Sequence, residues 1–234
     1  MIKVILFDLD GTLLPMDQER FAGAYVKGLT LAAESAGYSP MILSTAIVAG
    51  TAAMVKNNGE KTNEEVFWEI FYSVYGMNAE KDMPIFDEFY RENFDDVKCS
   101  CGYDPLAANT VAGVKAMGYR VALATNPVFP FVATERRIKW AGIDPCEFEL
   151  ITTYENSRYC KPNLKYYEDI VRSLGVSPEE CLMVGNDVDE DLITESLGMK
   201  VFLVTKSLIN KKNKDISVYP HGDLNDLIEF IKQI

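Results

Sequence analysis

The sequence predicts an α/β fold, in which a Rossmann-like parallel sheet is interrupted by an all-helical insert. Short apolar runs alternate with helical patterns over most of the chain, an order typical of doubly wound parallel sheets. The first run is apolar without alternation, as expected for a strand that helices cover on both faces. Between residues 14 and 104, helical patterns replace the strand patterns. The expected core therefore comprises residues 1–15 and 104–234, and the insert comprises residues 16–103.

The expected core elements are short apolar runs and amphipathic segments with clear end signals. Asp104 and Pro105 open one helix with a cap residue and a proline at the first helical position, and Gly118 ends it. Glycine also follows three of the later helical segments. We expect strands at 3–7, 120–125, 149–152, 181–185 and 200–204, and further helices at 131–141, 163–174, 192–197 and 224–231.

The insert is predicted to be helical, with a small core of aromatic side chains. Residues 17–37 carry apolar side chains at helical spacing, and Thr62 with Glu65 forms a capping-box pattern at the start of another helix. We interpret the aromatic residues mainly as this core, although some of them could face a substrate. They include Phe21, Tyr25, Phe67, Phe71, Phe86, Phe89, Tyr90 and Phe94.

Composition and charge exclude several classes of partner. The chain of 234 residues is 48% apolar and 25% charged, which is ordinary for a globular protein, but its net charge is −12. Such an acidic protein is poorly suited to nucleic acids or anionic membranes, so we expect neither as a partner. Five cysteines, an odd number, and the lack of a signal-peptide pattern predict reduced thiols and a cytoplasmic location. The oligomeric state is not determined, and a monomer is favoured.

Two carboxylates directly follow the first predicted strand. Asp8 and Asp10 lie where ligands bind in open parallel sheets, at the carboxyl end of a strand. Because they are two residues apart, both side chains can point to the same side. Together they could hold a divalent cation or divide nucleophilic and acid–base work. The alternative is a solvated turn, since Asp and Gly are common turn residues.

Four segments resemble the motifs of the haloacid dehalogenase (HAD) superfamily, in the same order. The nucleophile motif DxDGT stands intact at residues 8–12, and residues 122–126 (ALATN) resemble the second motif, an apolar strand that ends in Thr or Ser. Lys161-Pro162 resembles the third motif, and residues 185–191 (GNDVDED) resemble the acidic fourth. The resemblance covers almost the whole chain. It implies that the helical insert is a C1 cap, which closes over the site and selects the substrate.

The resemblance implies a phosphomonoester hydrolase that uses a covalent intermediate. Asp8 would attack phosphorus and form an aspartyl-phosphate. Asp10 would protonate the leaving oxygen and then activate water. Lys161 would balance the charge of Asp8 and of the transferring phosphoryl group. The residues expected to bind phosphate are Thr12, Thr125, Asn126 and Lys161.

Mg²⁺ is the cofactor that the resemblance implies, with Asp8 and the backbone carbonyl of Asp10 among its ligands. The next ligand is open, because an alignment without a gap puts Asn186 on the first acid of the fourth motif. Taking Asp187 as that acid leaves three residues before Asp191, a spacing that the family also uses. Since Mg²⁺ prefers anionic oxygen, we expect Asp187 to be the ligand and Asn186 the alternative.

The other acids of the fourth motif receive different roles. Asp191 would orient a metal-bound water or hold Lys161. Asp189 and Glu190 are expected at a solvated helix N-terminus, where acidic side chains are favourable.

Several rival functions remain open. A phosphomutase of the same family would return the phosphoryl group to its substrate. A phosphonate hydrolase would form a Schiff base with a cap lysine. A non-catalytic binding or regulatory protein is disfavoured because Asp8 and Asp10 are both present. Since the dehalogenase branch of the family lacks the second aspartate, Asp10 also favours phosphoryl chemistry over dehalogenation. A small phosphorylated substrate is the expected partner, and its identity is not predicted. The candidate cap lysines are Lys27, Lys56, Lys61, Lys81 and Lys98.

Overall fold

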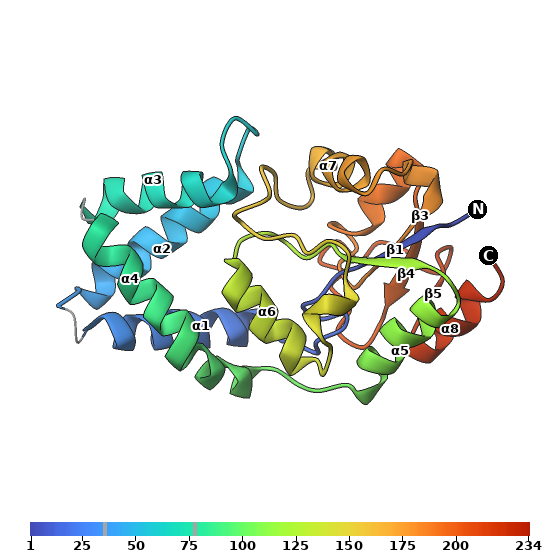
Figure 1. Cartoon of the computed structure of the whole chain (residues 1–234), viewed down its shortest axis with the longest axis horizontal. Coiled ribbons are helices and arrows are strands. Elements are labelled where there is room, and N and C mark those ends of the chain that lie inside the picture. Colours follow the sequence, from blue (N-terminus) through green and yellow to red (C-terminus); the bar gives the residue numbers. More distant parts are fainter. Residues whose placement is uncertain (35–36, 77–78) are drawn as a thin grey trace.

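The computed structural model describes residues 1–34, 37–76 and 79–234, apart from the side chains of residues 79–82. Its strands form one parallel sheet in the order β2-β1-β3-β4-β5, so the predicted α/β fold is confirmed (Figure 1). The strands are β1 (Val4–Phe7), β2 (Arg120–Leu123), β3 (Cys181–Gly185), β4 (Lys200–Val204) and β5 (His221–Gly222).

Two strand assignments differ from the sequence prediction. The predicted strand at 149–152 is wrong, because the segment forms only an isolated bridge between Ile151 and Leu123. The segment still runs beside β2, since Glu149 N donates to Val121 O at 2.9 Å and Thr152 N donates to Leu123 O at 3.1 Å, but it forms no continuous strand. The edge strand β5 was not predicted, since a strand of two residues shows no periodicity.

Helices cover both faces of the sheet and create two apolar layers. Alternate side chains of β1 enter opposite layers: Ile5 and Phe7 pack on the side of α5 and α8, and Val4 and Leu6 pack on the side of α7 (Figure 1). The helical elements of the core are α5 (Pro105–Ala116), α6 (Phe131–Trp140), η3 (Pro145–Glu147), α7 (Leu164–Leu174), η4 (Pro178–Glu180), η5 (Leu192–Leu197) and α8 (Leu224–Ile231), of which η3, η4 and η5 are 3₁₀ helices.

The insert between β1 and β2 is helical in its described part and lies beside the carboxyl ends of the strands (Figure 1). Each aromatic residue named above for its core is buried. For example, the ring centroids of Phe71 and Phe86 lie 5.2 Å apart, edge to face. None of the described helices is long and apolar enough to span a membrane. The elements are α1 (Gln18–Glu34), α2 (Pro40–Val55), α3 (Asn63–Tyr75), α4 (Ala79–Glu88), the π-helical turn η1 (Phe89–Asn93) and the 3₁₀ helix η2 (Phe94–Ser100).

Asn63 ties the start of α3 to two loops of the core. Its side chain is fully buried. The amide Nδ2 donates to the carbonyl oxygen of Pro127 at 3.1 Å, and the backbone N–H donates to Ser157 O at 2.8 Å. Its Oδ1 accepts a hydrogen bond from Asn57 Nδ2 at 2.8 Å. These bonds fix one end of the insert against the core.

Replacing Asn63 by Ala should lower the free energy of unfolding by about 2–3 kcal/mol, because buried hydrogen-bonding groups lose their partner. Asn58→Ala is the control, since Asn58 is exposed and its side chain accepts one hydrogen bond, from Glu60 N. The control should change stability by less than about 0.5 kcal/mol in urea unfolding. Equal effects of the two substitutions would show that Asn63 does not anchor the insert.

Candidate active site

The carboxyl ends of three neighbouring strands meet at one edge of the sheet. The register aligns them, because Asp8 N donates to Val184 O at 2.8 Å and Ala124 N donates to Phe7 O at 2.7 Å. Asp8 therefore follows β1 beside Asn186, which follows β3. On the other side of β1, Thr125 comes two residues after the end of β2 and is buried.

Asp8, Lys161 and Asp191 form a buried charge cluster. Lys161 Nζ lies 2.8 Å from Asp8 Oδ1 and 2.8 Å from Asp191 Oδ1. Burial opposes the positive charge, but Asp191 and Asp8 outweigh it and raise the pKa of Lys161 well above its usual value. Burial also raises the pKa of Asp191 to about 6, against the opposing effect of Lys161. The cation thus lies directly against the predicted nucleophile.

The turn after β1 brings Asn186 close to Asp8. Thr12 Oγ1 lies 2.9 Å from Asp8 Oδ2 and 3.1 Å from Asn186 Oδ1. Asn186 Nδ2 donates to Ser207 O at 2.6 Å, which fixes the amide with its oxygen toward Thr12. Gly11 has a φ of 94°, and a Cβ at this position would lie 2.2 Å from Asn186 Nδ2. The turn therefore needs glycine for both conformation and space.

Asp187, the ligand expected from charge, caps the turn that follows it. Its Oδ1 accepts hydrogen bonds from Asp189 N at 2.8 Å and from Glu190 N at 3.0 Å. Its own N–H donates to Asp191 Oδ2 at 3.0 Å. One carboxylate oxygen of Asp187 is thus used in local structure, although the residue also lines the cavity described below.

Glu190 corrects the expectation of a solvated carboxylate. The residue is half-buried, and both of its carboxylate oxygens lie 3.5 Å from Asn126 Nδ2. Burial raises the pKa of Glu190 to about 7, against the opposing effect of Lys161. Asn126 therefore faces an acid, and its own Oδ1 is buried with no hydrogen-bond partner in the part of the chain that the structure describes.

Arg137 forms an ion pair with Asp10 that the sequence analysis missed. Arg137 is fully buried on α6, and its guanidinium lies 4.5 Å from the centroid of the Phe129 ring. Burial raises the pKa of Asp10, and Arg137 opposes that rise. Asp10 Oδ1 is buried and has no hydrogen-bond partner among the described residues. The sequence did carry a signal for this burial, namely the helical spacing of small and apolar residues around Arg137. The buried residues on this side of the segment are Ala133, Thr134, Ile138 and Ala141.

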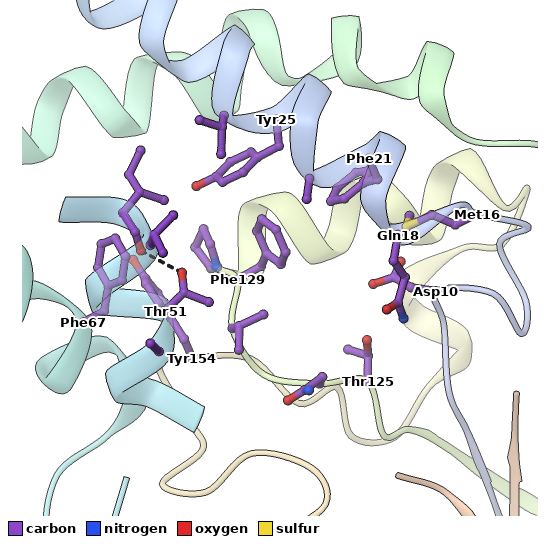
Figure 2. Close-up of a pocket in the computed structure, with 18 of the residues that line it drawn as sticks. Asp10, Met16, Gln18, Phe21, Tyr25, Thr51, Phe67, Thr125, Phe129 and Tyr154 are labelled. Carbon is purple, nitrogen blue, oxygen red and sulfur yellow. Dashed lines mark hydrogen bonds between the residues drawn. The ribbon is translucent and has the colours of Figure 1, made fainter. Parts of the chain in front are cut away.

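A cavity of about 500 Å³ opens in front of these residues, between the sheet edge and the insert. Figure 2 shows Asp10 and Thr125 at one end of it and Tyr25, Phe67 and Tyr154 around the other. Thr12 and Lys161, both buried, contact Asp8. The predicted site residues that line the cavity are Asp8, Asp10, Thr125, Asn126, Asn186, Asp187 and Asp191.

The donors at the sheet edge are oxygen atoms, which suit a hard cation such as Mg²⁺. In the described part of the chain, no three His, Cys, Asp or Glu side chains gather closely enough to hold a metal ion. Carboxylates alone therefore do not complete a coordination shell. Asn186 Oδ1 is an additional oxygen donor beside Asp8, because both contact the Thr12 hydroxyl.

Comparison with known proteins assigns the chain to a family. The model of the haloacid dehalogenase-like hydrolase family matches residues 2–194. Glyceraldehyde 3-phosphate phosphatase of Methanothermobacter thermautotrophicus is 28% identical over 135 residues, which cover 54% of this chain and 58% of that protein. The chain thus spans less than two thirds of that relative. Pyrophosphatase PpaX of Bacillus cereus (strain AH820) is 22% identical over 207 residues, covering 88% of this chain and 85% of that protein.

A solved structure agrees at the level of the fold. The 2-haloacid dehalogenase from Pseudomonas syringae pv. Tomato DC3000 superposes with a TM-score of 0.67 at 18% identity, covering 100% of this chain and 99% of that one. The family model extends over most of the chain, from β1 into the segment that carries Asp191. The protein therefore belongs to the haloacid dehalogenase-like hydrolase family.

Proposed function

We propose that the protein is a Mg²⁺-dependent phosphomonoester hydrolase that acts on a small phosphorylated metabolite. The observation that carries this proposal is the buried Asp8 carboxylate, which lines the cavity with Lys161 on one oxygen and Thr12 on the other. The phosphatase and pyrophosphatase relatives support the same reaction class.

The reaction would proceed in two displacements at phosphorus. In the first, an oxygen of Asp8 attacks phosphorus, the bond from phosphorus to the leaving oxygen breaks, and Asp10 gives that oxygen a proton. In the second, Asp10 takes a proton from water, which displaces Asp8 and releases phosphate. Lys161 offsets the negative charge that Asp8 and the phosphoryl group bring together. Thr125 and Asn126, which follow the end of β2, would bind the phosphoryl oxygens.

The residues that would hold Mg²⁺ are Asp8, through its carboxylate, and Asp10, through its backbone carbonyl. Asn186 or Asp187 would be the third. The ion would supply positive charge to the phosphoryl oxygens during the transfer. Asp191 would act indirectly, by holding the ammonium group of Lys161 through their ion pair.

The insert at residues 16–103 would act as a mobile cap. The cavity supports this role, because the insert forms its wall opposite the catalytic carboxylates. Closing such a cavity would exclude water and select the substrate. The phosphonate alternative needs a lysine in the cavity, and the described lining residues include none; the side chain of Lys81 lies outside the described part. No observation favours a phosphomutase over a hydrolase.

Asp8→Asn should reduce the hydrolysis of p-nitrophenyl phosphate by about a thousandfold or more, because the nucleophile is lost. The melting temperature should stay close to that of the wild type, since Lys161 keeps Asp191 as an ion-pair partner. Phosphate release measures the first effect and thermal unfolding the second. Asp96→Asn, at an exposed position on η2, is the control and should keep wild-type activity. Near-normal turnover by Asp8→Asn would rule out the covalent mechanism.

Removing metal with EDTA should abolish turnover, and Mg²⁺ should restore it. The geometry favours Asn186 as the third ligand, because its Oδ1 lies 3.1 Å from the Thr12 hydroxyl that also contacts Asp8. One oxygen of Asp187, in contrast, already accepts a hydrogen bond from Asp189 N. Asn186→Ala should therefore raise the Mg²⁺ concentration for half-maximal activity roughly tenfold. Asp187→Ala should raise it less. A larger effect of Asp187→Ala would favour the ligand expected from charge alone.

Arg137→Met should lower the free energy of unfolding by about 3 kcal/mol, because it leaves the mostly buried Asp10 without its cation. Arg136→Met is the matched control on the same helix. Its ion pair with Asp95 is partly exposed, so the change should be within about 1 kcal/mol. Urea unfolding of both variants measures the difference. If Arg137→Met unfolds like the control, the buried ion pair does not hold Asp10 in place.

A further inference from the structure

The cavity in front of Asp8 has two chemically different ends. Among its described lining residues, the charged ones are all acidic and all lie at the sheet edge or in the loop after β3. The opposite wall comes from the insert and from the loops that follow β2, and Figure 2 shows aromatic rings gathered there. The aromatic lining residues are Phe21, Tyr25, Phe67, Trp68, Phe86, Tyr90, Phe129 and Tyr154.

Among the described residues, no cationic side chain would face the leaving group of a phosphoester in the cavity. In the part of the chain that the structure describes, the cavity is lined by no lysine, arginine or histidine. The buried cations nearby are already paired, Arg137 with Asp10 and Lys161 with Asp8 and Asp191. A carboxylate or a second phosphate on the leaving group would therefore lose its water without gaining an opposite charge.

The hydroxyl groups of the aromatic wall are largely used within the protein. Tyr25 and Tyr90 share a hydrogen bond of 2.8 Å between their hydroxyl oxygens. Thr51 Oγ1 donates to Ile47 O at 2.9 Å. Trp68 Nε1, which is buried without a hydrogen-bond partner among the described residues, could donate to one acceptor. A sugar with several hydroxyl groups would still leave others with few partners, which is unfavourable.

The cavity adjoins a second hollow on the surface, between α1 and α2. The two share the lining residues Ala22 and Val26. The second hollow includes the exposed side chains of Leu31 and Met41, but Lys27 and Glu34 of α1 line it as well. The apolar surface offered to a leaving group is therefore that of the cavity itself.

From these observations we infer that the substrate is a phosphomonoester with an uncharged, apolar leaving group, an alkyl chain or an aromatic ring. The phosphate lies at Asp8 and the apolar group lies against the aromatic wall. This inference rests on the proposed hydrolase function and narrows its substrate class. It also separates this protein from relatives named for glyceraldehyde 3-phosphate and pyrophosphate.

The first test compares kcat/KM across phosphomonoesters with Mg²⁺ present. From butyl to octyl phosphate, each added methylene should raise kcat/KM about three- to fourfold, as expected for burial of one CH₂ group. Phenyl phosphate should be preferred to phosphoglycolate, glucose 6-phosphate and pyrophosphate. Preference for any of these three, with activity that still depends on Asp8, would overturn the substrate class and leave the hydrolase function intact.

The second test places a charge on the apolar wall. Val48 lines the cavity and is 62% exposed, whereas Val55, on the same helix, is 48% exposed and is not among the residues that line the cavity. Val48→Asp should lower the ratio of kcat/KM for octyl over butyl phosphate at least tenfold. Val55→Asp should leave this ratio unchanged. Equal ratios in the two variants would place the alkyl chain elsewhere.

A binding measurement separates this inference from the proposed reaction. Calorimetry with the Asp8→Asn protein should show tighter binding of octyl phosphate than of butyl phosphate. If the wild type hydrolyses none of the esters but this order of affinities holds, the reaction is wrong and the apolar site stands. If affinity does not increase with chain length, the inference about the leaving group is wrong.

Discussion

The buried ammonium group of Lys161 is the constraint around which the site is arranged. A charge taken out of water needs close opposite charges, and Asp8 and Asp191 supply them at 2.8 Å each. Asp191 in turn accepts the N–H of Asp187 and so fixes the loop after β3. One desolvated cation thereby links the ends of β1 and β3 to the segment before α7. Asp8, the proposed nucleophile, is positioned by the same contacts that stabilise the buried charge of Lys161.

The two ends of the cavity differ in polarity because the core and the insert stabilise their buried side chains in different ways. At the sheet edge, parallel strands end together, so polar side chains and their counter-charges collect there. In the insert, aromatic rings pack on one another and need few polar partners. A phosphoester lying between them would meet charge at its phosphate and apolar surface at its leaving group. The proposed division of reactivity and substrate selection between core and insert would have this physical origin.

The fold alone does not choose among the reactions that this family performs. A haloacid dehalogenase superposes well on the chain, and relatives named as phosphatases align with it as well. The side chains at the strand ends are what favour phosphoryl transfer, above all the second aspartate, Asp10. Its pairing with Arg137 adds a feature that comes from α6, outside the four sequence motifs.

The sequence by itself determined the parallel α/β core and the helical insert, because apolar periodicity is a local signal. Short motifs, which are also local, identified the family and the candidate site residues that follow β1 and β3. The tertiary structure decided the pairing of Arg137 with Asp10 and the half-buried state of Glu190 beside Asn126. It also reduced the strand expected at 149–152 to an isolated bridge between Ile151 and Leu123. These features depend on contacts between residues far apart in the chain, and burial sets their energies.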